Sequence, residues 1–209
     1  MIYELFRWFA IITAYPAQLV FFKRKTYYED KADYKRQKKK GALIISNHFN
    51  ILDYIMNMFL VLPRKLYIVA SEYAFRNKLI SFGMRFFGGI QADRNSRSMG
   101  FIDKSVELIK KGSLVQIFPE GHNTPDGQIK DFRPTYIMIA LRAGSRIIPV
   151  VTDGSYSLFK RAHVMVGRSI DLSEYGLNEH SSKQDIISAN EAIRERVIKL
   201  RERLEELKR

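Results

Sequence analysis

His48 and Asp53, five residues apart after a short apolar run, could act together as a base. Five residues of a continuous helix rotate by ~500°, so the two side chains can meet only if His48 lies before the helix that contains Asp53. With Asn50 as the N-cap, Asp53 falls in the first turn, where its carboxylate can face back toward the imidazole. That hydrogen bond would leave the other ring nitrogen free as a general base. The alternative is a capping carboxylate next to an incidental histidine.

Two later segments offer groups that could bind a phosphate or a hydroxyl. Arg94 ends GGIQADR, and an arginine fork matches phosphate geometry, although a surface arginine would also explain it. In the segment FPEG, which begins at Phe118, Pro119 stiffens the turn and Glu120 offers an acceptor for a hydroxyl. Gly121 lets the backbone approach a ligand closely, and a tight turn without a ligand is the alternative. Because these segments follow predicted strands, they favour a ligand site at the carboxyl ends of the strands of one sheet.

Four segments together resemble the motifs of the glycerolipid acyltransferase family. They are NHFNILD at 47–53, GGIQADR at 88–94, FPEG at 118–121 and IIPV at 147–150, in the family's order and spacing. The resemblance extends over roughly residues 41–155. It implies transfer of a fatty acyl group from an acyl thioester, either acyl-CoA or acyl-carrier protein, to the free sn-2 hydroxyl of lysophosphatidic acid, which forms phosphatidic acid.

The resemblance also implies a role for each matched residue. His48 would be the general base and Asp53 its orienting partner. Arg94 would hold the acceptor phosphate, and Glu120 with Gly121 would shape the acceptor site. We expect no metal and no cofactor beyond the acyl thioester as co-substrate, because the four histidines are scattered and the chain has no cysteine.

Two positions depart from the family pattern. Gln91 stands where the second motif usually has an aromatic residue, and His122-Asn123 follow FPEG where the family commonly has Thr-Arg-Ser or similar. Asn123 removes a second cationic phosphate ligand, which Lys130 or Arg133 could replace. The departures leave two alternatives open: an acyltransferase for another phosphate- or hydroxyl-bearing lipid, or a catalytically silent peripheral lipid-binding protein.

The chain is strongly basic, with 35 Lys and Arg against 22 Asp and Glu, a formal net charge of +13 and a pI near 9.9. This charge favours an anionic partner. Nucleic acid is not expected, because the chain has no RNP-like aromatic motif, zinc finger or clear helix-turn-helix. We expect the partners to be an anionic membrane surface, the lysophospholipid acceptor, and acyl-CoA or an acidic acyl-carrier protein as donor.

The apolar segment near the start of the chain predicts membrane association. Residues 8–22 are apolar but shorter than the ~20 residues that span hydrocarbon, and they contain Pro16. We expect a re-entrant or interfacial helical hairpin over residues 1–22, with a single tilted span as the alternative. Residues 23–40 predict a basic helix or arm on anionic headgroups, with a solvated charged face that has no partner as the alternative. The protein is therefore expected at the cell membrane, peripheral or monotopic, with its catalytic domain on the cytoplasmic side.

Buried-type apolar runs alternate with amphipathic stretches after residue 40, which predicts an α/β sheet with helices on both faces. With the resemblance, we expect a mixed, largely parallel sheet of the glycerol-phosphate acyltransferase-like type. The expected domains are a membrane-associated segment at 1–40 and an α/β domain at 41–209. The latter ends in an amphipathic helix, 182–209, that packs on the body or on a partner. The expected strands are 42–46, 65–71, 114–118, 146–154 and 163–170, with a short segment at 90–94, and the other expected helices are 50–62, 74–86, 99–110 and 134–143.

Overall fold

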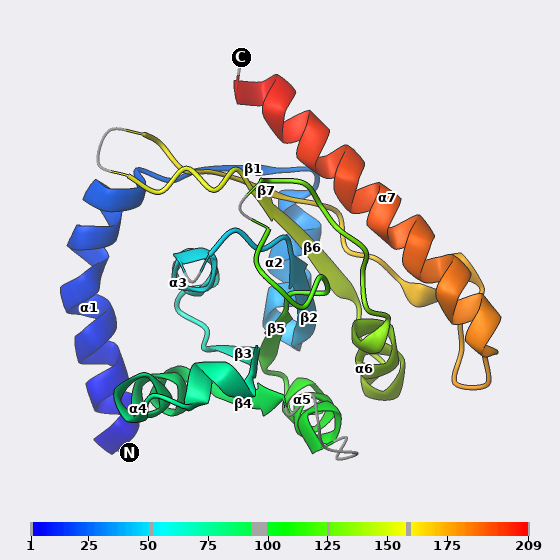
Figure 1. Ribbon diagram of the computed structural model, residues 1–209, viewed down its shortest axis with the longest axis horizontal. Helices are drawn as coiled ribbons and strands as arrows, with labels where there is room; N and C mark the ends of the chain where they lie inside the picture. Colours follow the sequence, from blue (N-terminus) through cyan, green and yellow to red (C-terminus); the bar gives the residue numbers. More distant parts are fainter. Residues whose placement is uncertain (1, 51, 93–99, 125, 158–159, 209) are drawn as a thin grey trace.

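A computed structural model describes residues 2–208 except 51, 93–99, 125 and 158–159. Its centre is a sheet of the strands β1 Lys25–Tyr28, β2 Ala42–Ser46, β3 Leu66–Ser71, β4 Gly89–Ala92, β5 Leu114–Ile117, β6 Ile147–Thr152 and β7 His163–Val166. The strand order is β1-β7-β6-β2-β5-β3-β4 (Figure 1). Neighbouring strands run parallel except β6 and β7, which are antiparallel. The expected mixed, largely parallel sheet is confirmed.

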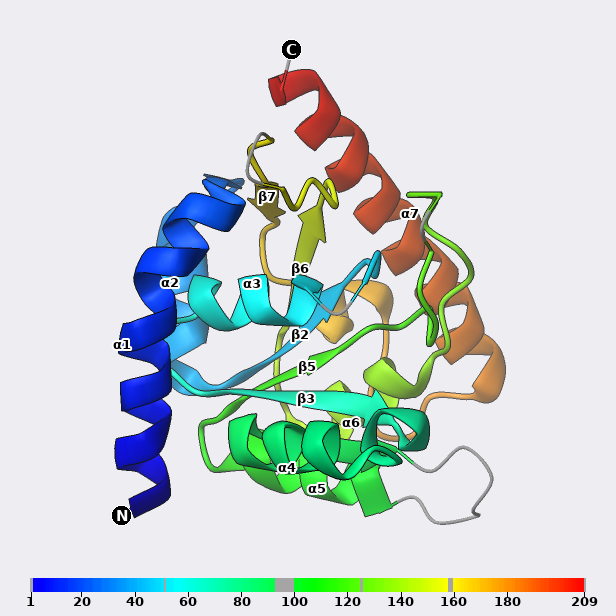
Figure 2. The ribbon, with the colours of Figure 1, turned by 60° about the vertical axis from the view of Figure 1, so that its left-hand side comes forward.

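Helices cover both faces of this sheet, as predicted. They are α1 Ile2–Phe22, α2 Lys31–Lys40, α3 Leu52–Leu60, α4 Lys78–Phe87, α5 Gly100–Lys110, α6 Thr135–Ala143 and α7 Lys183–Lys208, with 3-10 turns at η1 Glu72–Phe75 and η2 Leu172–Tyr175. One core joins α5, α6 and α7 to the sheet, and a second core joins α2, α3, α4 and the end of α1 to its other face (Figures 1 and 2). β2, β5 and β6 are buried along their whole length, as covered parallel strands usually are.

The apolar segment at the start of the chain is one continuous helix, α1, so the predicted hairpin is wrong. Pro16 lies inside α1, where a proline removes a backbone donor at a cost of about 3 kcal/mol. Contacts with α3 and α4 offset this cost, among them an edge-to-face contact of Tyr15 with Phe59 at 6.1 Å between ring centroids. Across the described part of the chain, no helix combines the length and the apolar character that crossing a membrane requires.

Residues 23–40 contribute a strand to the sheet as well as the expected basic helix. Lys25–Tyr28 form β1, which pairs in parallel with β7, and the basic helix is α2, which begins at Lys31. The sheet therefore takes residues from both sides of residue 40. The sequence pattern missed β1 because KTYY lies at the edge of the sheet and is partly exposed, without a buried apolar run.

Acidic side chains anchor α2 to the body. Asp30 caps the helix by accepting a hydrogen bond from Asp33 N at 2.9 Å. The Asp33 carboxylate accepts from Arg36 at 2.8 Å, Gln37 at 3.0 Å and Ser169 N at 2.8 Å. Burial acts to raise the pKa of Asp33, but these hydrogen bonds outweigh it and hold the pKa well below its usual range.

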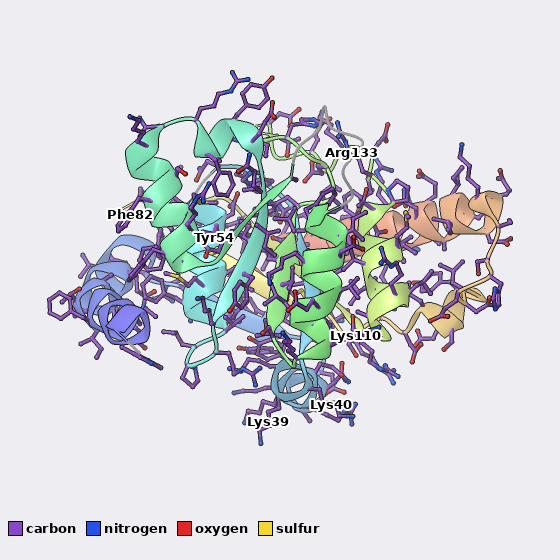
Figure 3. All side chains as sticks on the ribbon, turned by 90° about the horizontal axis from the view of Figure 1, so that it is seen from below. Lys39, Lys40, Tyr54, Phe82, Lys110 and Arg133 are labelled. Carbon is purple, nitrogen blue, oxygen red and sulfur yellow. The ribbon has the colours of Figure 1, made fainter. Side chains whose placement is uncertain are left out.

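Part of the positive charge of the chain lies at helix ends. Lys38, Lys39 and Lys40 occupy the last turn of α2, and Lys110 ends α5. Cations at these positions are stabilised by the negative end of the helix dipole. Figure 3 shows Lys39, Lys40 and Lys110 on the side of the molecule opposite Arg133. Stabilisation of the helix ends therefore explains these lysines without a binding partner.

The C-terminal amphipathic helix, α7, packs on the body of the same chain, against β6 and β7. Its predicted apolar stripe is confirmed up to Leu204, while Leu207 is 46% exposed. The last turn also joins the loop after β6, because Lys208 Nζ lies 3.0 Å from Asp153 Oδ2. The buried residues of the stripe are Ala189, Ile193, Val197, Leu200 and Leu204.

Candidate active site

His48 and Asp53 lie side by side after the carboxyl end of β2. The side chain of Asn50 accepts a hydrogen bond from Leu52 N at 2.8 Å, and α3 starts there. Asp53 is consequently in the first turn of α3, with the preceding loop folded back over it. His48 Nδ1 and Asp53 Oδ2 are 3.0 Å apart. The sequence-predicted contact between these two side chains is thus present in the structure.

Asp53 is fully buried and accepts hydrogen bonds at both carboxylate oxygens. Besides His48, Oδ2 accepts from Phe49 N at 2.6 Å and Asn50 N at 2.8 Å, and Oδ1 accepts from the hydroxyl of Tyr156. An ionised carboxylate is an acceptor only, so the proton between Asp53 and the imidazole belongs to Nδ1. In the neutral ring Nε2 then carries a free lone pair, which is the state a general base requires.

The ring of His48 is also held by an aromatic neighbour. Phe118 stacks on the imidazole with 3.8 Å between centroids and 8° between planes. Stacking on one side and the Asp53 hydrogen bond at Nδ1 together restrict rotation of the ring. The side chain of His48 keeps 17% of its surface exposed, so the ring is positioned but accessible.

Glu120 holds the loop that carries His48. Its carboxylate, 1% exposed, accepts hydrogen bonds from His48 N, Thr124 Oγ1 and Lys130 N, each at 3.1 Å. Burial raises the pKa of Glu120, although these hydrogen bonds act in the opposite direction. The structure thus places this side chain behind the loop, and it is absent from the set of residues that line the adjoining cavity.

His48 opens onto a cavity of about 680 Å³ at the carboxyl ends of β3, β4 and β5. Phe118, Pro119 and Gly121 line it, as the sequence predicts for a ligand site after β5. Much of the remaining wall is apolar, and a wall of this kind suits a hydrocarbon chain. The apolar wall includes Ile68, Val69, Met84, Phe101, Ile102 and Ile117.

Arg133 brings a cation to this cavity. Among the described residues, no carboxylate lies within 4.0 Å of its guanidinium, so the charge is available to a ligand. The side chain runs along Gly121, where a Cβ would lie 3.0 Å from Arg133 Nε. Gly121 also has a φ of +73°, a conformation that L residues rarely adopt. Glycine at this position therefore allows both the turn and the close approach of the arginine.

The other predicted cations differ in where the structure places them. Lys130 Nζ pairs with Asp126 at 2.8 Å and is absent from the cavity wall, so of the two replacements considered for the missing cation only Arg133 reaches the cavity. Arg94 lies outside the described residues, and its contact with a phosphate stays a prediction. Within the described ranges, no group of three or more His, Asp or Glu side chains could hold a metal ion.

Tyr156 is the residue at this site that sequence reasoning missed. It follows the end of β6 by four residues, after Gly154, whose φ of +68° turns the chain. No spacing rule ties a tyrosine in such a turn to an aspartate 103 positions earlier. The only sequence signal is its place after a buried strand, at the edge where the other site residues gather.

Comparison with known proteins finds acyltransferases among the relatives of this chain. The chain is 24% identical to a 1-acyl-sn-glycerol-3-phosphate acyltransferase of Bacillus subtilis over 170 residues, which cover 80% of this chain and 84% of the relative. It is 29% identical to the human 1-acyl-sn-glycerol-3-phosphate acyltransferase beta over 131 residues, 59% of this chain and 45% of the relative. Several curated relatives are matched over less than half of their length.

A solved structure shares the fold. The crystal structure of the 1-acyl-sn-glycerophosphate acyltransferase PlsC from Thermotoga maritima superposes with a TM-score of 0.61 at 20% identity, covering 90% of this chain and 73% of that one. The sequence profile described as Acyltransferase matches residues 27–153, which include His48, Asp53 and the FPEG segment. Because that profile covers more than half of the chain, the protein belongs to the Acyltransferase family.

Proposed function

We propose that this protein transfers a fatty acyl group from an acyl thioester to the free sn-2 hydroxyl of lysophosphatidic acid, forming phosphatidic acid. The observation that carries the proposal is the His48–Asp53 hydrogen bond of 3.0 Å beside an apolar cavity that is also lined by Arg133, whose guanidinium has no carboxylate partner among the described residues. A base, a space for hydrocarbon and a cation for phosphate are among the requirements of this reaction. The names of the relatives support the same acceptor.

The reaction is a direct displacement. The acceptor hydroxyl loses its proton to His48 Nε2 as its oxygen attacks the thioester carbonyl. The new C–O bond forms, the C–S bond breaks, and the thiolate leaves with the proton returned by the imidazolium. A positioned base contributes ~10²–10⁴-fold to such a step, and donors to the carbonyl oxygen add ~10²–10³-fold each. Ser46 is not a candidate for an acyl-enzyme, because its hydroxyl is buried and donates to Asn47 O.

The acceptor phosphate is held by Arg133 in this proposal, with Arg94 as a second ligand. Arg133 replaces the cation that the substitution at Asn123 removes. An arginine fork can donate two parallel hydrogen bonds to a phosphate. The substitutions at Gln91 and Asn123 also favour a second candidate, an acyltransferase for a different phosphate- or hydroxyl-bearing lipid.

The donor is acyl-CoA or an acidic acyl-carrier protein, and no metal or other cofactor takes part. The apolar wall of the cavity would receive the acyl chain, so that the thioester carbonyl comes to lie beside His48. The positive charge of the protein would attract either donor, since CoA carries phosphates and carrier proteins are acidic.

The exposed face of α1 supports a place at the cell membrane, peripheral or monotopic, with the catalytic cavity on the cytoplasmic side. Phe9 and Ile12 are each 66% exposed, and Phe82 on the adjoining α4 is 67% exposed (Figure 3). Large apolar side chains exposed on two adjoining helices are a common feature of membrane-interaction surfaces. With Lys23 and Lys25 following α1, the face suits the headgroup region of an anionic lipid bilayer.

A donor and acceptor assay tests the proposal. Purified full-length protein is given lysophosphatidic acid, a phosphate-free monoacylglycerol and other lysophospholipids, each with acyl-CoA or acyl-carrier protein. We expect turnover of lysophosphatidic acid, a loss of at least ~100-fold in His48→Ala, and no loss in His180→Ala, a control at an exposed loop histidine. Equal rates for wild type and His48→Ala would rule out His48 as the general base. Binding to anionic liposomes without turnover of any acceptor would make the protein a lipid-binding one instead.

A further inference from the structure

The two oxygens of Asp53 have different partners. Oδ2 accepts from His48 and from two backbone N–H groups, as described above. For Oδ1, the donor among the described residues is the Tyr156 hydroxyl. Because Asp53 is fully buried, solvent cannot replace that donor at this oxygen. The orientation of the carboxylate therefore depends on the tyrosine as well as on the start of α3.

Tyr156 is itself held in place from two sides. Its hydroxyl lies 2.9 Å from Thr152 Oγ1, at the end of β6. Its ring contacts Phe22, the last residue of α1, edge to face with 5.5 Å between centroids. Burial and the nearby charge of Asp53 raise the pKa of Tyr156 far above its usual value. The hydroxyl thus keeps its proton and can donate to Asp53 throughout the working pH range.

We propose that Tyr156 is a positioning residue, whose hydroxyl holds Asp53 in the orientation that presents Nε2 of His48 to the acceptor. The inference rests on the proposed function, since it concerns the same base. Tyr156 lies just beyond the residues that the family profile matches and is not part of the cavity wall, so it acts through Asp53 rather than on substrate.

Removal of the hydroxyl has two consequences that a general packing role would not produce. The carboxylate loses its donor at Oδ1 and is then held only through Oδ2, so it can tilt away from the imidazole, which lowers kcat while acceptor binding is unchanged. A carboxylate that has moved from the imidazole also stabilises the protonated ring less, so the acidic limb of the rate profile moves to lower pH. The other titratable groups around the pair, Glu120, Asp153, His122 and Arg133, stay as they are in the variant.

The test compares wild type with Tyr156→Phe in lysophosphatidic acid acylation across a pH series. We expect Tyr156→Phe to lower kcat by about tenfold with an unchanged KM for the acceptor, and to move the acidic limb to lower pH. Tyr34→Phe is the matched control, because it also removes a buried hydroxyl, which donates to Leu60 O at 3.1 Å away from the cavity. Wild-type kcat and pH profile in Tyr156→Phe would overturn the proposal.

A second variant and a second measurement separate this inference from the proposed function. If Tyr156→Phe does not fold, Thr152→Val takes its place, because it removes the hydroxyl that orients the Tyr156 hydroxyl. A Thr152→Val variant with unchanged kcat and an unchanged acidic limb would then overturn the proposal. If wild type turns over no acceptor, the proposed function fails, and the ¹⁵N shifts of the His48 ring then test the geometry alone. We expect the Nδ1–H tautomer in wild type and its loss in Tyr156→Phe, and identical spectra would contradict it.

Discussion

Replacement of Arg133 by glutamine should weaken binding of the acceptor selectively. The guanidinium lines the cavity, and no carboxylate of the described residues neutralises it, so its loss removes the hydrogen bonds of a cation to the phosphate. Such charged hydrogen bonds contribute about 1.5–3 kcal/mol, which corresponds to a rise of about 10–100-fold in KM for lysophosphatidic acid. The kcat should change little, because the His48–Asp53 hydrogen bond does not involve Arg133.

Initial rates measured against acceptor concentration, at a fixed saturating donor, give both constants. Lys130→Gln is the matched control: its Nζ pairs with Asp126 at the surface, where 40% and 50% of the two side chains are exposed, and such pairs contribute about 0–1 kcal/mol. Adding Asn123→Arg to Arg133→Gln should restore part of the affinity, since residue 123 also lines the cavity. An unchanged KM in Arg133→Gln, with the same preference for phosphorylated over phosphate-free acceptors, would refute the assignment.

Three further changes test other parts of the structure. Asp53→Asn should lower kcat by ~10²–10⁴-fold, because it disfavours the required imidazole tautomer; steady-state kinetics measure this loss, and thermal unfolding measures separately the stability lost with the buried carboxylate. The pKa of Asp33 is lower in the folded protein than in the unfolded chain, so the ionised carboxylate stabilises the fold above its unfolded pKa, and this stability is lost as the pH falls toward the folded pKa. Asp33→Asn should therefore lower the free energy of unfolding by about 2 kcal/mol at neutral pH. In urea unfolding, the variant should also show a weaker dependence of stability on acid pH. Ile12→Asp should reduce sedimentation with anionic liposomes, whereas Ile187→Asp, at an exposed apolar residue of α7, should not; equal binding of the two would contradict the membrane face.

The central sheet was predictable because its strands are short apolar runs buried on both faces. ALIIS and IIPVVT have no polar side that could face solvent, so a strand covered by helices is the structure they favour. The same holds for α7, whose apolar residues recur at helical spacing. β1 was not predictable in this way, because an edge strand with partly exposed residues has no such pattern.

The hairpin prediction for α1 failed for a related reason. A proline inside an apolar segment argues for a break when local propensity is considered alone, but tertiary contacts with α3 and α4 hold the helix together across Pro16. Sequence reasoning about propensity therefore undervalued packing between segments that are far apart in the chain.

The candidate site was predictable where its geometry is local. His48 and Asp53 are five residues apart, and the start of α3 after Asn50 brings them to the same turn of the chain. The placement of Glu120 behind the loop and of Tyr156 on Asp53 depends on how distant strands end side by side, which no local pattern contains. The same is true of Arg133, whose approach to Gly121 follows from the return of the loop after β5.

Because β2 lies in the middle of the sheet, the position of His48, which follows it, is kept for as long as the whole domain stays folded. β2 pairs with β5 on one side and β6 on the other, and every one of its residues is buried. Such a strand opens only when the domain as a whole unfolds. A destabilising substitution elsewhere in the core will then reduce the number of intact molecules in a cell, while each molecule that remains intact works at its normal speed.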